Sequence, residues 1–500
     1  MRRLAQLLFL SVLSSGCFDG AGLEAPIDEI YFPTGLVLDK SGEHLIVVSS
    51  DFDLQYDGGS IQSYRLDDLF EQLPKRCADD DDCDDPERPL CASGLCAPSL
   101  SESPCEQGDR APEDQLLYPG RCNFIDNKPL IASAVKIGAF ATDAVIRSDP
   151  NAENRERLFV PVRGDTTLTW VDVEDGGFEC GQGANSNACD GAHRAGQHPA
   201  RENTRDLSLG PEPFGIDANE DGSTLVVTNQ TTGTASLFVN DWDVPTQGPY
   251  LKFALASNTI PSRPMGVAAL PRRPGDTAES TTSDSFLMTF RNSAQVRLLR
   301  YAPDAASSPE RQYLVDGGGV GIDTNAVGVD SRGIAVDPAA RRAATARCNG
   351  DAACEQQASL TPLDVYVANR SPASILIGRT QPPLEYPAFF STVPLTFGPA
   401  RVAVSPVETP NGELETRVFV ACFDSRRVFV FDPLRRRIEV EILTGRGPQA
   451  LVVDTPRKLL YVGHFTDSYV GVYSLDLASP ATYGTLLGSL GYPKAPRSSK

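Results

Sequence analysis

A pair of short β-strands recurs seven times along this chain, and this repetition limits the folds that are open to it. Each copy begins with Pro, Gly or another small residue and continues with alternating apolar and polar positions. A turn of acidic or small residues then leads into a second strand rich in Val, Ile, Phe and Tyr. One copy cannot bury both faces of its own strands, so the copies have to pack on one another. The first strands occupy residues 33–39, 136–146, 212–218, 263–270, 331–338, 398–406 and 447–454.

The spacing of these copies indicates one architecture. Self-similar units of four strands and roughly 45 to 50 residues are typical of propeller blades. Seven such units account for most of the 500 residues once polar insertions are set aside. The sequence therefore predicts an all-β fold, a seven-bladed β-propeller over residues 30–500 with loop insertions stapled by disulfides. The segment 483–490 supplies either the last outer strand or a partner for the strand near residues 27–32.

The charge balance excludes one class of partner. The formal net charge is −21, whereas a protein that binds nucleic acid needs a basic face for the phosphates. We therefore expect no nucleic acid partner. The 41% content of hydrophobic residues is enough for a large core.

The first residues resemble a bacterial lipoprotein signal. A basic start and a short apolar stretch lead into Ser-Ser-Gly-Cys, and the stretch is too short to span a bilayer. This resemblance implies that residues 1–16 are a signal peptide, that Cys17 carries the lipid and that residues 17–29 form a tether. Phe18 follows the cysteine where a retention signal would have Asp, so the expected location is the bacterial cell envelope, at the outer membrane. Ordinary secretory cleavage is the alternative, because Ser14 replaces the usual aliphatic residue.

The cysteines indicate an oxidising compartment. Ten of the twelve fall in local clusters, which predicts five local disulfides. These clusters mark a Cys-rich insertion at 70–125, which resembles a short disulfide repeat of secreted bacterial proteins, and a second insertion at 174–208. Six cysteines allow fifteen pairings, so the sequence leaves the connectivity of the first cluster open. The clustered residues are Cys77, Cys83, Cys91, Cys96, Cys105, Cys122, Cys180, Cys189, Cys348 and Cys354.

Three segments carry a family resemblance. Residues 224–239, 363–377 and 458–476 resemble the YVTN and NHL class of propeller repeats, which bacteria use in extracytoplasmic and surface proteins. The resemblance implies a propeller over nearly the whole chain after residue 30. It implies little about activity, because that class contains binding scaffolds, lactonases and cofactor-bearing oxidoreductase subunits.

The ends of the second strands predict a ring of side chains about the propeller axis. Aligning these ends gives one column of Ser50, Val162, Asn229, Phe290, Asn369, Cys422 and His464, and a next column of Asp51, Arg163, Gln230, Arg291, Arg370, Phe423 and Phe465. Forked guanidinium groups and aromatic rings suit an anionic or sugar-like ligand. The candidate ligand-binding residues are Arg163, Arg291, Arg370, Asn229, Asn369, Phe423 and His464. The alternative is that these residues only close and pack the strand ends.

Two further sets of residues suggest chemistry. Asp51, Asp53 and Asp57 precede two glycines and offer three oxygens to Ca²⁺, and solvated loop carboxylates are the alternative. Cys422, which lies outside the clusters, is one blade before His464 in the same column. Either the two residues form a nucleophile pair, or Cys422 is a small apolar residue buried in the core. We predict no other cofactor.

The function predicted from these patterns is binding without catalysis. We expect a cell-envelope lipoprotein whose propeller is a binding or scaffold module for a protein, glycan or envelope component, held to the membrane through the lipid on Cys17. The alternative is a propeller-type lactonase or metal-dependent hydrolase. That alternative requires convergent carboxylates or histidines at the channel, and the two columns supply only Asp51 and His464.

Overall fold

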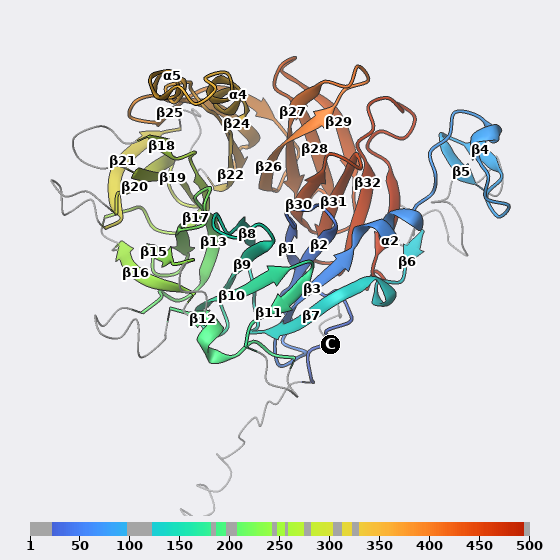
Figure 1. Ribbon diagram of the computed structural model, residues 1–500, viewed down its shortest axis with the longest axis horizontal. Helices are drawn as coiled ribbons and strands as arrows, with labels where there is room; N and C mark the ends of the chain where they lie inside the picture. The colour runs from blue at the N-terminus through green and yellow to red at the C-terminus, as the bar shows by residue number, and fades with distance from the viewer. Residues whose placement is uncertain are drawn as a thin grey trace, which may run out of the picture.

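Seven small sheets stand as blades around one central axis in the computed structural model of this chain (Figure 1). The structure describes residues 23–97, 123–181, 187–196, 208–242, 248–255, 259–274, 282–303, 313–322 and 330–494. Each blade contains four hydrogen-bonded strands in sequence order, and three blades carry one additional strand. The prediction of an all-β, seven-bladed propeller is confirmed.

The first four blades take their strands from the first two thirds of the chain. Blade one consists of β1 (Pro33–Leu38), β2 (His44–Ser49), β3 (Gly59–Arg65) and β7 (Ile131–Ile137). Blade two consists of β8 (Val145–Ser148), β9 (Arg155–Val162), β10 (Thr167–Glu174), β11 (Gly177–Glu179) and β12 (Arg194–Ala195). Blade three consists of β13 (Pro213–Ala218), β14 (Thr224–Asn229), β15 (Thr234–Asn240) and β16 (Pro249–Leu255). Blade four consists of β17 (Pro264–Ala269), β18 (Arg273–Pro274), β19 (Thr282–Phe290), β20 (Gln295–Tyr301) and β21 (Val315–Gly321).

The last three blades complete the ring. Blade five consists of β22 (Ser331–Asp337), β23 (Asp364–Arg370), β24 (Ala373–Gln381) and β25 (Tyr386–Pro394). Blade six consists of β26 (Pro399–Glu408), β27 (Leu414–Cys422), β28 (Arg427–Asp432) and β29 (Arg437–Leu443). Blade seven consists of β30 (Pro448–Asp454), β31 (Leu459–His464), β32 (Tyr469–Ser474), β33 (Leu486–Leu490) and β6 (Phe124–Ile125).

The ring closes between blade seven and blade one. Strand β33 is antiparallel to β32, and β6 adds to its free edge in the parallel direction. Of the two arrangements that the sequence leaves open for this segment, the structure therefore has the outer strand. Inner strand β1 packs directly against inner strand β30. Residues 23–29, which belong to the expected tether, contact blade one, where the Gln62 side chain donates to the carbonyl oxygens of Ile27 and Glu29.

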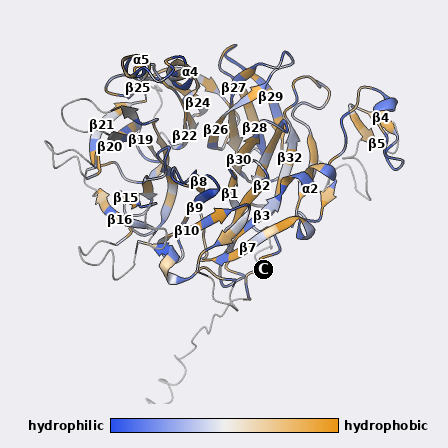
Figure 2. Cartoon of the chain, in the orientation of Figure 1, coloured by the Kyte–Doolittle hydropathy of each residue, from blue (hydrophilic) through white to orange (hydrophobic). Residues whose placement is uncertain are grey.

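The core lies between neighbouring blades. Strands rich in Val, Ile and Leu are buried on both faces, because each blade is covered by the blades beside it; every residue of β2, β14 and β31 is buried. The cluster that joins the ends of the ring combines Leu45 and Val47 of blade one with Tyr461 and Val470 of blade seven. Figure 2 shows this pattern, with hydrophobic colour concentrated in the strands.

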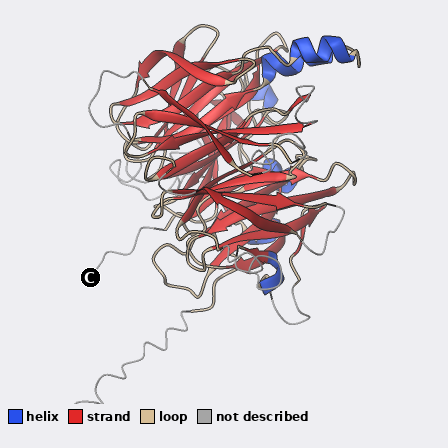
Figure 3. Ribbon diagram, turned by 90° about the vertical axis from the view of Figure 1, so that its left-hand side faces the viewer, coloured by secondary structure: helices blue, strands red, loops and turns tan. Residues whose placement is uncertain are grey.

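The insertions leave the ends of the blades. After β3 come α2 (Leu66–Glu71), η1 (Asp80–Asp82) and a small sheet of β4 (Leu90–Ala92) and β5 (Leu95–Ala97), which projects from the ring, and then η3 (Lys128–Leu130) (Figure 1). The second insertion contains η4 (Gly191–His193). Helices α4 (Ala339–Ala346) and α5 (Ala352–Ala358) follow inner strand β22. Figure 3 shows the helical segments gathered at one face of the ring.

Four of the predicted disulfides lie in the described residues. They join Cys77 to Cys91, Cys83 to Cys96, Cys180 to Cys189 and Cys348 to Cys354. Cys105 and Cys122 lie outside the described residues, as do residues 1–22 with the predicted signal peptide and Cys17. In the described ranges, no helix is both long and apolar enough to cross a membrane.

Candidate functional site

The inner strands of all seven blades begin at the same end of the axis, which we call the mouth. In every blade the first residue of the inner segment pairs with a residue at the end of the second strand. The residue after the second-strand partner donates its backbone N–H to the carbonyl oxygen of the residue before the inner-segment partner. The donating residues are Ser50, Arg163, Gln230, Arg291, Arg370, Phe423 and Phe465. The accepting residues are Phe32, Phe140, Glu212, Arg263, Asp330, Gly398 and Gly447. Main-chain hydrogen bonds therefore fix two rings of side chains around the mouth.

The structural alignment differs from the sequence alignment in blade one. Pro33 pairs with Ser49, whereas the equivalent Pro213 of blade three pairs with Asn229. The blade-one members of the two columns are therefore Ser49 and Ser50, each one position earlier than predicted. The loop after β2 is longer than the corresponding loops of the other blades. Its additional polar residues shifted the sequence alignment of blade one by one residue.

The first predicted column is buried inside the blades and contributes strand-end packing. Asn229 donates to the carbonyl oxygen of Gly210 at 2.7 Å and accepts a hydrogen bond from Ser236. Asn369 donates to the carbonyl oxygen of Pro372 at 2.7 Å. His464 stacks on Tyr469 with ring centroids 4.1 Å apart. None of these three side chains lines the cavity at the mouth.

The second column surrounds a cavity of about 460 Å³ at the mouth. Arg163, Arg370, Phe423 and Phe465 all line it, together with residues at the starts of the inner strands. Arg291 is not among the lining residues, although its guanidinium group interacts electrostatically with that of Arg332. A cavity of this size is in the range of small-molecule sites.

One side of the mouth is cationic. We call Arg263, Arg291, Arg332 and Arg370, from blades four and five, the arginine arc. Arg332 binds Asp330 through two hydrogen bonds of 2.5 and 2.8 Å. Arg370 forms an ion pair with Asp424, and the Nε atom of Arg291 is 3.7 Å from Asp330. Burial lowers the pKa of the Arg291 guanidinium, and the other three cations of the arc lower it further, although Asp330 opposes them. The other three guanidinium groups thus repel that of Arg291, and the Asp330 carboxylate offsets this repulsion only in part.

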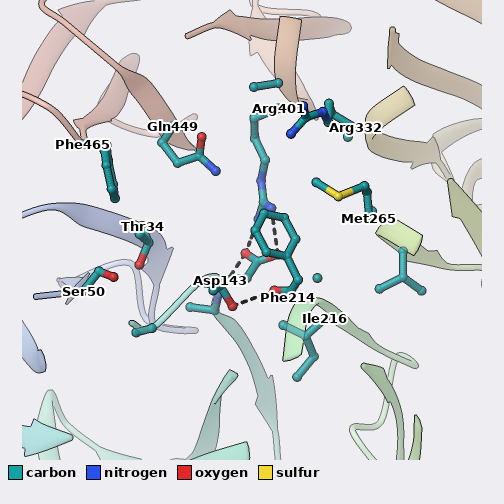
Figure 4. Close-up of a pocket in the computed structure, with 18 of the residues that line it drawn as sticks. Thr34, Ser50, Asp143, Phe214, Ile216, Met265, Arg332, Arg401, Gln449 and Phe465 are labelled. Carbon is teal, nitrogen blue, oxygen red and sulfur yellow. Dashed lines mark hydrogen bonds and ion pairs between the residues drawn. The ribbon is translucent and has the colours of Figure 1, made fainter. Parts of the chain in front are cut away.

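The other side of the mouth is aromatic. We call Phe32, Phe52, Phe140, Phe423 and Phe465, from blades one, two, six and seven, the aromatic arc. The ring of Phe52 meets those of Phe140 and Phe465 edge to face, with centroids 5.7 and 5.1 Å apart. Phe465 also contacts Phe423 at 6.0 Å and Phe32 at 5.1 Å. Figure 4 shows Phe465 and Arg332 on opposite sides of the cavity.

An ion pair crosses the cavity. Arg401, on the inner strand of blade six, binds the carboxylate of Asp143 in blade two with both terminal nitrogens, one of them at 2.7 Å (Figure 4). Blades two and six are as far apart as a ring of seven allows, so this pair spans the axis. Burial opposes the charge of Arg401, but the adjacent Asp143 carboxylate raises the pKa of this guanidinium above its ordinary value.

The sequence contains a signal for this pair in the inner strands rather than in the second strands. The third position of the inner-strand column is Gly or Ala in five blades. At Gly215 and Gly266 an added Cβ would come within 2.2 and 2.4 Å of the backbone of the next blade, so the small residue lets inner strands pack closely. Asp143 and Arg401 are the two exceptions. The column is Gly35, Asp143, Gly215, Gly266, Gly333, Arg401 and Ala450.

The predicted Ca²⁺ ligands are separately engaged. Asp51 is fully buried and accepts a hydrogen bond from the backbone of Tyr56 at 3.1 Å, and burial raises its pKa to about 6. Asp53 is exposed. Asp57 accepts a hydrogen bond from Lys136 at 3.0 Å. Within the described residues these three carboxylates do not converge; the one cluster of three potential ligands there is Cys77, Cys83 and Cys96, which form disulfides.

Cys422 and His464 are both completely buried, in adjacent blades. Burial raises the pKa of the Cys422 thiol to about 12 and lowers the pKa of His464 to about 3. At neutral pH the thiol is therefore protonated and the imidazole is neutral. Burial disfavours the thiolate that a nucleophile requires, and Cys422 packs in the core with Val420 and Phe431.

Comparisons with known proteins extend no further than the fold. No protein-family model matches the sequence, and no curated protein is similar to it. Among solved structures, a periplasmic gluconolactonase of Pseudomonas aeruginosa is similar over 83% of this chain and 86% of its own, with 11% identity and a TM-score of 0.46. Hydrazine synthase of Kuenenia stuttgartiensis is similar over 92% and 100%, with 10% identity and a TM-score of 0.48. Virginiamycin B lyase of Staphylococcus aureus is similar over 87% and 94%, with 9% identity and a TM-score of 0.42. These similarities are too distant to assign an activity.

Proposed function

We propose that this protein is an extracytoplasmic binding protein and that the cavity at the mouth of its central channel binds a small organic anion. The observation that carries the proposal is the arginine arc, in which four guanidinium groups surround only two carboxylates. Arg332 and Arg370 present these charges to the cavity itself. A guanidinium group offers a planar fork of donors that matches a carboxylate or a phosphate.

The rest of the molecule makes this cluster of cations unusual. The whole chain has a formal charge of −21, so arginines gathered at one opening oppose the general trend. Repulsion between them costs free energy that an anion in the cavity would recover. At physiological ionic strength, charges beyond about 8 Å are largely screened, so the acidic surface elsewhere does not prevent an anion from binding.

The cysteines and the N-terminal sequence support the extracytoplasmic location in this proposal. Four disulfides at bonding distance favour an oxidising compartment, because thiols in the cytosol are kept reduced. We extend the proposal to a lipid anchor on Cys17 and to residence at the outer membrane of the cell envelope. A soluble envelope metabolite or an anionic group of an envelope glycan would then be the ligand.

Titration calorimetry with the full-length protein in detergent tests this function. The probes are acetate, benzoate, methyl phosphate and phenyl phosphate, with Arg332→Ala as the test variant. Arg379→Ala is the matched control. Arg379 lies on β24, outside the cavity, and its Nε atom is 2.6 Å from the Oδ1 atom of Asp364. A hydrogen bond to a charged group contributes about 1.5 to 3 kcal/mol, so Arg332→Ala should weaken binding roughly tenfold or more.

Three results bear on the proposal. Binding that Arg332→Ala weakens and Arg379→Ala preserves would support it. Binding of none of the four anions, or equal binding by both variants, would contradict it. Consumption of a lactone or another ester by the wild-type protein would favour the alternative of a hydrolase.

A further inference from the structure

The mouth has two chemically different sides, and we propose that the ligand has two matching parts. The inference rests on the proposed function and names its ligand class: an organic anion with an apolar, ring-bearing body. The anionic group faces the arginine arc on blades four and five. The apolar body lies against the aromatic arc on blades six, seven, one and two.

The aromatic arc exposes apolar surface at the mouth. Phe52 is 50% exposed although it stands at the rim of a cavity, and the remaining rings of the arc are only partly buried. Aromatic rings that contact one another at an opening form an apolar patch. Its exposure to water is unfavourable, so covering it with another apolar group is favourable. An apolar ring in the cavity would cover this patch, whereas an inorganic anion or a simple carboxylate would leave it wet.

The backbone is strained at two residues of the aromatic arc. Phe32 immediately precedes inner strand β1, and Phe140 holds the equivalent position in blade two, before the Ala141–Val162 bridge. Their φ angles are 46° and 60°. This left-handed conformation is unfavourable for a bulky residue, and the equivalent positions in blades six and seven are Gly398 and Gly447, with φ angles of 88° and 68°. The same turn therefore accepts glycine, which would relax the backbone. Glu212 and Arg263 adopt the same conformation in blades three and four, with φ angles of 54° and 59°, so the turn belongs to the repeat. In blades one and two the residue in this turn carries an aromatic ring to the mouth.

The two arcs are placed so that one molecule reaches both. Phe52, Phe140, Phe423 and Phe465 line the same cavity as Arg332 and Arg370. Figure 4 shows Phe465 and Arg332 across the cavity from each other, with the Arg401–Asp143 pair between and below them. The two charges of that pair neutralise each other, so it crosses the cavity without competing for the anionic group.

The test compares anions that share a charged group and differ in their body. The pairs are acetate with benzoate and methyl phosphate with phenyl phosphate, measured by titration calorimetry on the full-length protein. Burial of a phenyl ring against the aromatic arc should make the aromatic member of each pair bind about tenfold tighter or more. Phe52→Ala and Phe140→Gly should each remove much of this difference and leave the affinities for acetate and methyl phosphate unchanged.

Two controls separate binding from folding. Phe390→Ala removes a phenylalanine that is 56% exposed on outer strand β25, away from the cavity, and should leave all four affinities unchanged. Phe140→Gly replaces a strained residue with the residue found in blades six and seven, so its melting temperature should stay near that of the wild type. Weaker aromatic binding by a variant of unchanged stability is a result that a purely structural role for Phe140 does not give.

The outcomes distinguish this inference from the proposed function. Equal affinities within both pairs, with Arg332→Ala still harmful, would overturn the apolar body and leave anion binding in place. Phenylalanine variants that weaken both members of a pair equally would overturn it as well. If no anion binds, the proposed function and this inference fail together.

Discussion

Replacing Arg401 with Ala should destabilise the protein more than replacing its partner Asp143. The Asp143 side chain is 5% exposed and the Arg401 side chain is 34% exposed. Loss of Arg401 leaves a buried carboxylate without a counter-ion, whereas loss of Asp143 leaves a guanidinium that reaches the water of the cavity. Breaking a fully buried pair costs about 3 to 5 kcal/mol, and the exposure of Arg401 reduces this to roughly 2 to 3 kcal/mol for Arg401→Ala. For Asp143→Ala we expect about 1 kcal/mol.

The double variant Arg401→Ala/Asp143→Ala should be more stable than Arg401→Ala alone. It removes the pair without stranding a charge, so it should cost about 1 to 2 kcal/mol, less than Arg401→Ala alone. Urea unfolding of the four proteins at pH 7 measures these free energies, and the resulting coupling energy should be about 1.5 kcal/mol or more. Additive single effects, or an Arg401→Ala variant as stable as the wild type, would refute the view that this pair holds blades two and six together across the axis.

Three further predictions concern stability. Burial lowers the pKa of His464 from 6.5 to about 3, so the contribution of the neutral imidazole to stability is complete above pH 6.5. This contribution is lost as the pH falls toward 3. The melting temperature of His464→Gln should therefore depend less on pH between 3 and 6.5 than that of the wild type. Burial raises the pKa of Asp51 to about 6 from 3.8, so stability is lost as the pH rises through that interval, and Asp51→Asn should raise the melting temperature at pH 7 by removing the buried charge. An unchanged pH profile in either variant would contradict the corresponding assignment. Deletion of residues 483–500 removes β33, exposes the edge of β32 and leaves β6 unpaired, so it should sharply lower the melting temperature; unchanged melting would refute this account of ring closure.

The fold was predictable because the repeat is encoded locally. Each blade carries an alternating strand, a turn of small or acidic residues and a buried strand, and no arrangement other than a closed ring buries all seven copies alike. The blade count followed from this repeat, and the local disulfides followed from the clustering of the cysteines. The packing of residues 23–29 was less predictable, because their contacts with blade one join residues far apart in the sequence, such as Ala25 with Asp57 and Ile27 with Gln62.

The site was predictable only in part, because strand ends do not reveal where a side chain points. Arg163, Arg370 and Phe423 belong to the residues that line the cavity, whereas Asn229, Asn369 and His464, one position earlier, turn into the blades. This difference follows from the alternation of side chains along a strand, in which a shift of one residue reverses the face.

Other residues of the site depended on contacts that the sequence does not show. Phe52 and Phe140 come from loops of different length, and only the folded ring brings them together. Asp143 and Arg401 are separated by 258 positions, although each stands out as a charged residue in a column of Gly and Ala.

A crystal structure of the protein with 4-bromophenyl phosphate tests the central claim most directly, because the anomalous signal of bromine locates one end of the ligand and the phosphate density locates the other. The account predicts the phosphate beside Arg332 and Arg370 and the bromophenyl ring against Phe52 and Phe465. A ligand bound elsewhere, a reversed orientation, or an empty cavity at a saturating concentration of the compound would contradict it.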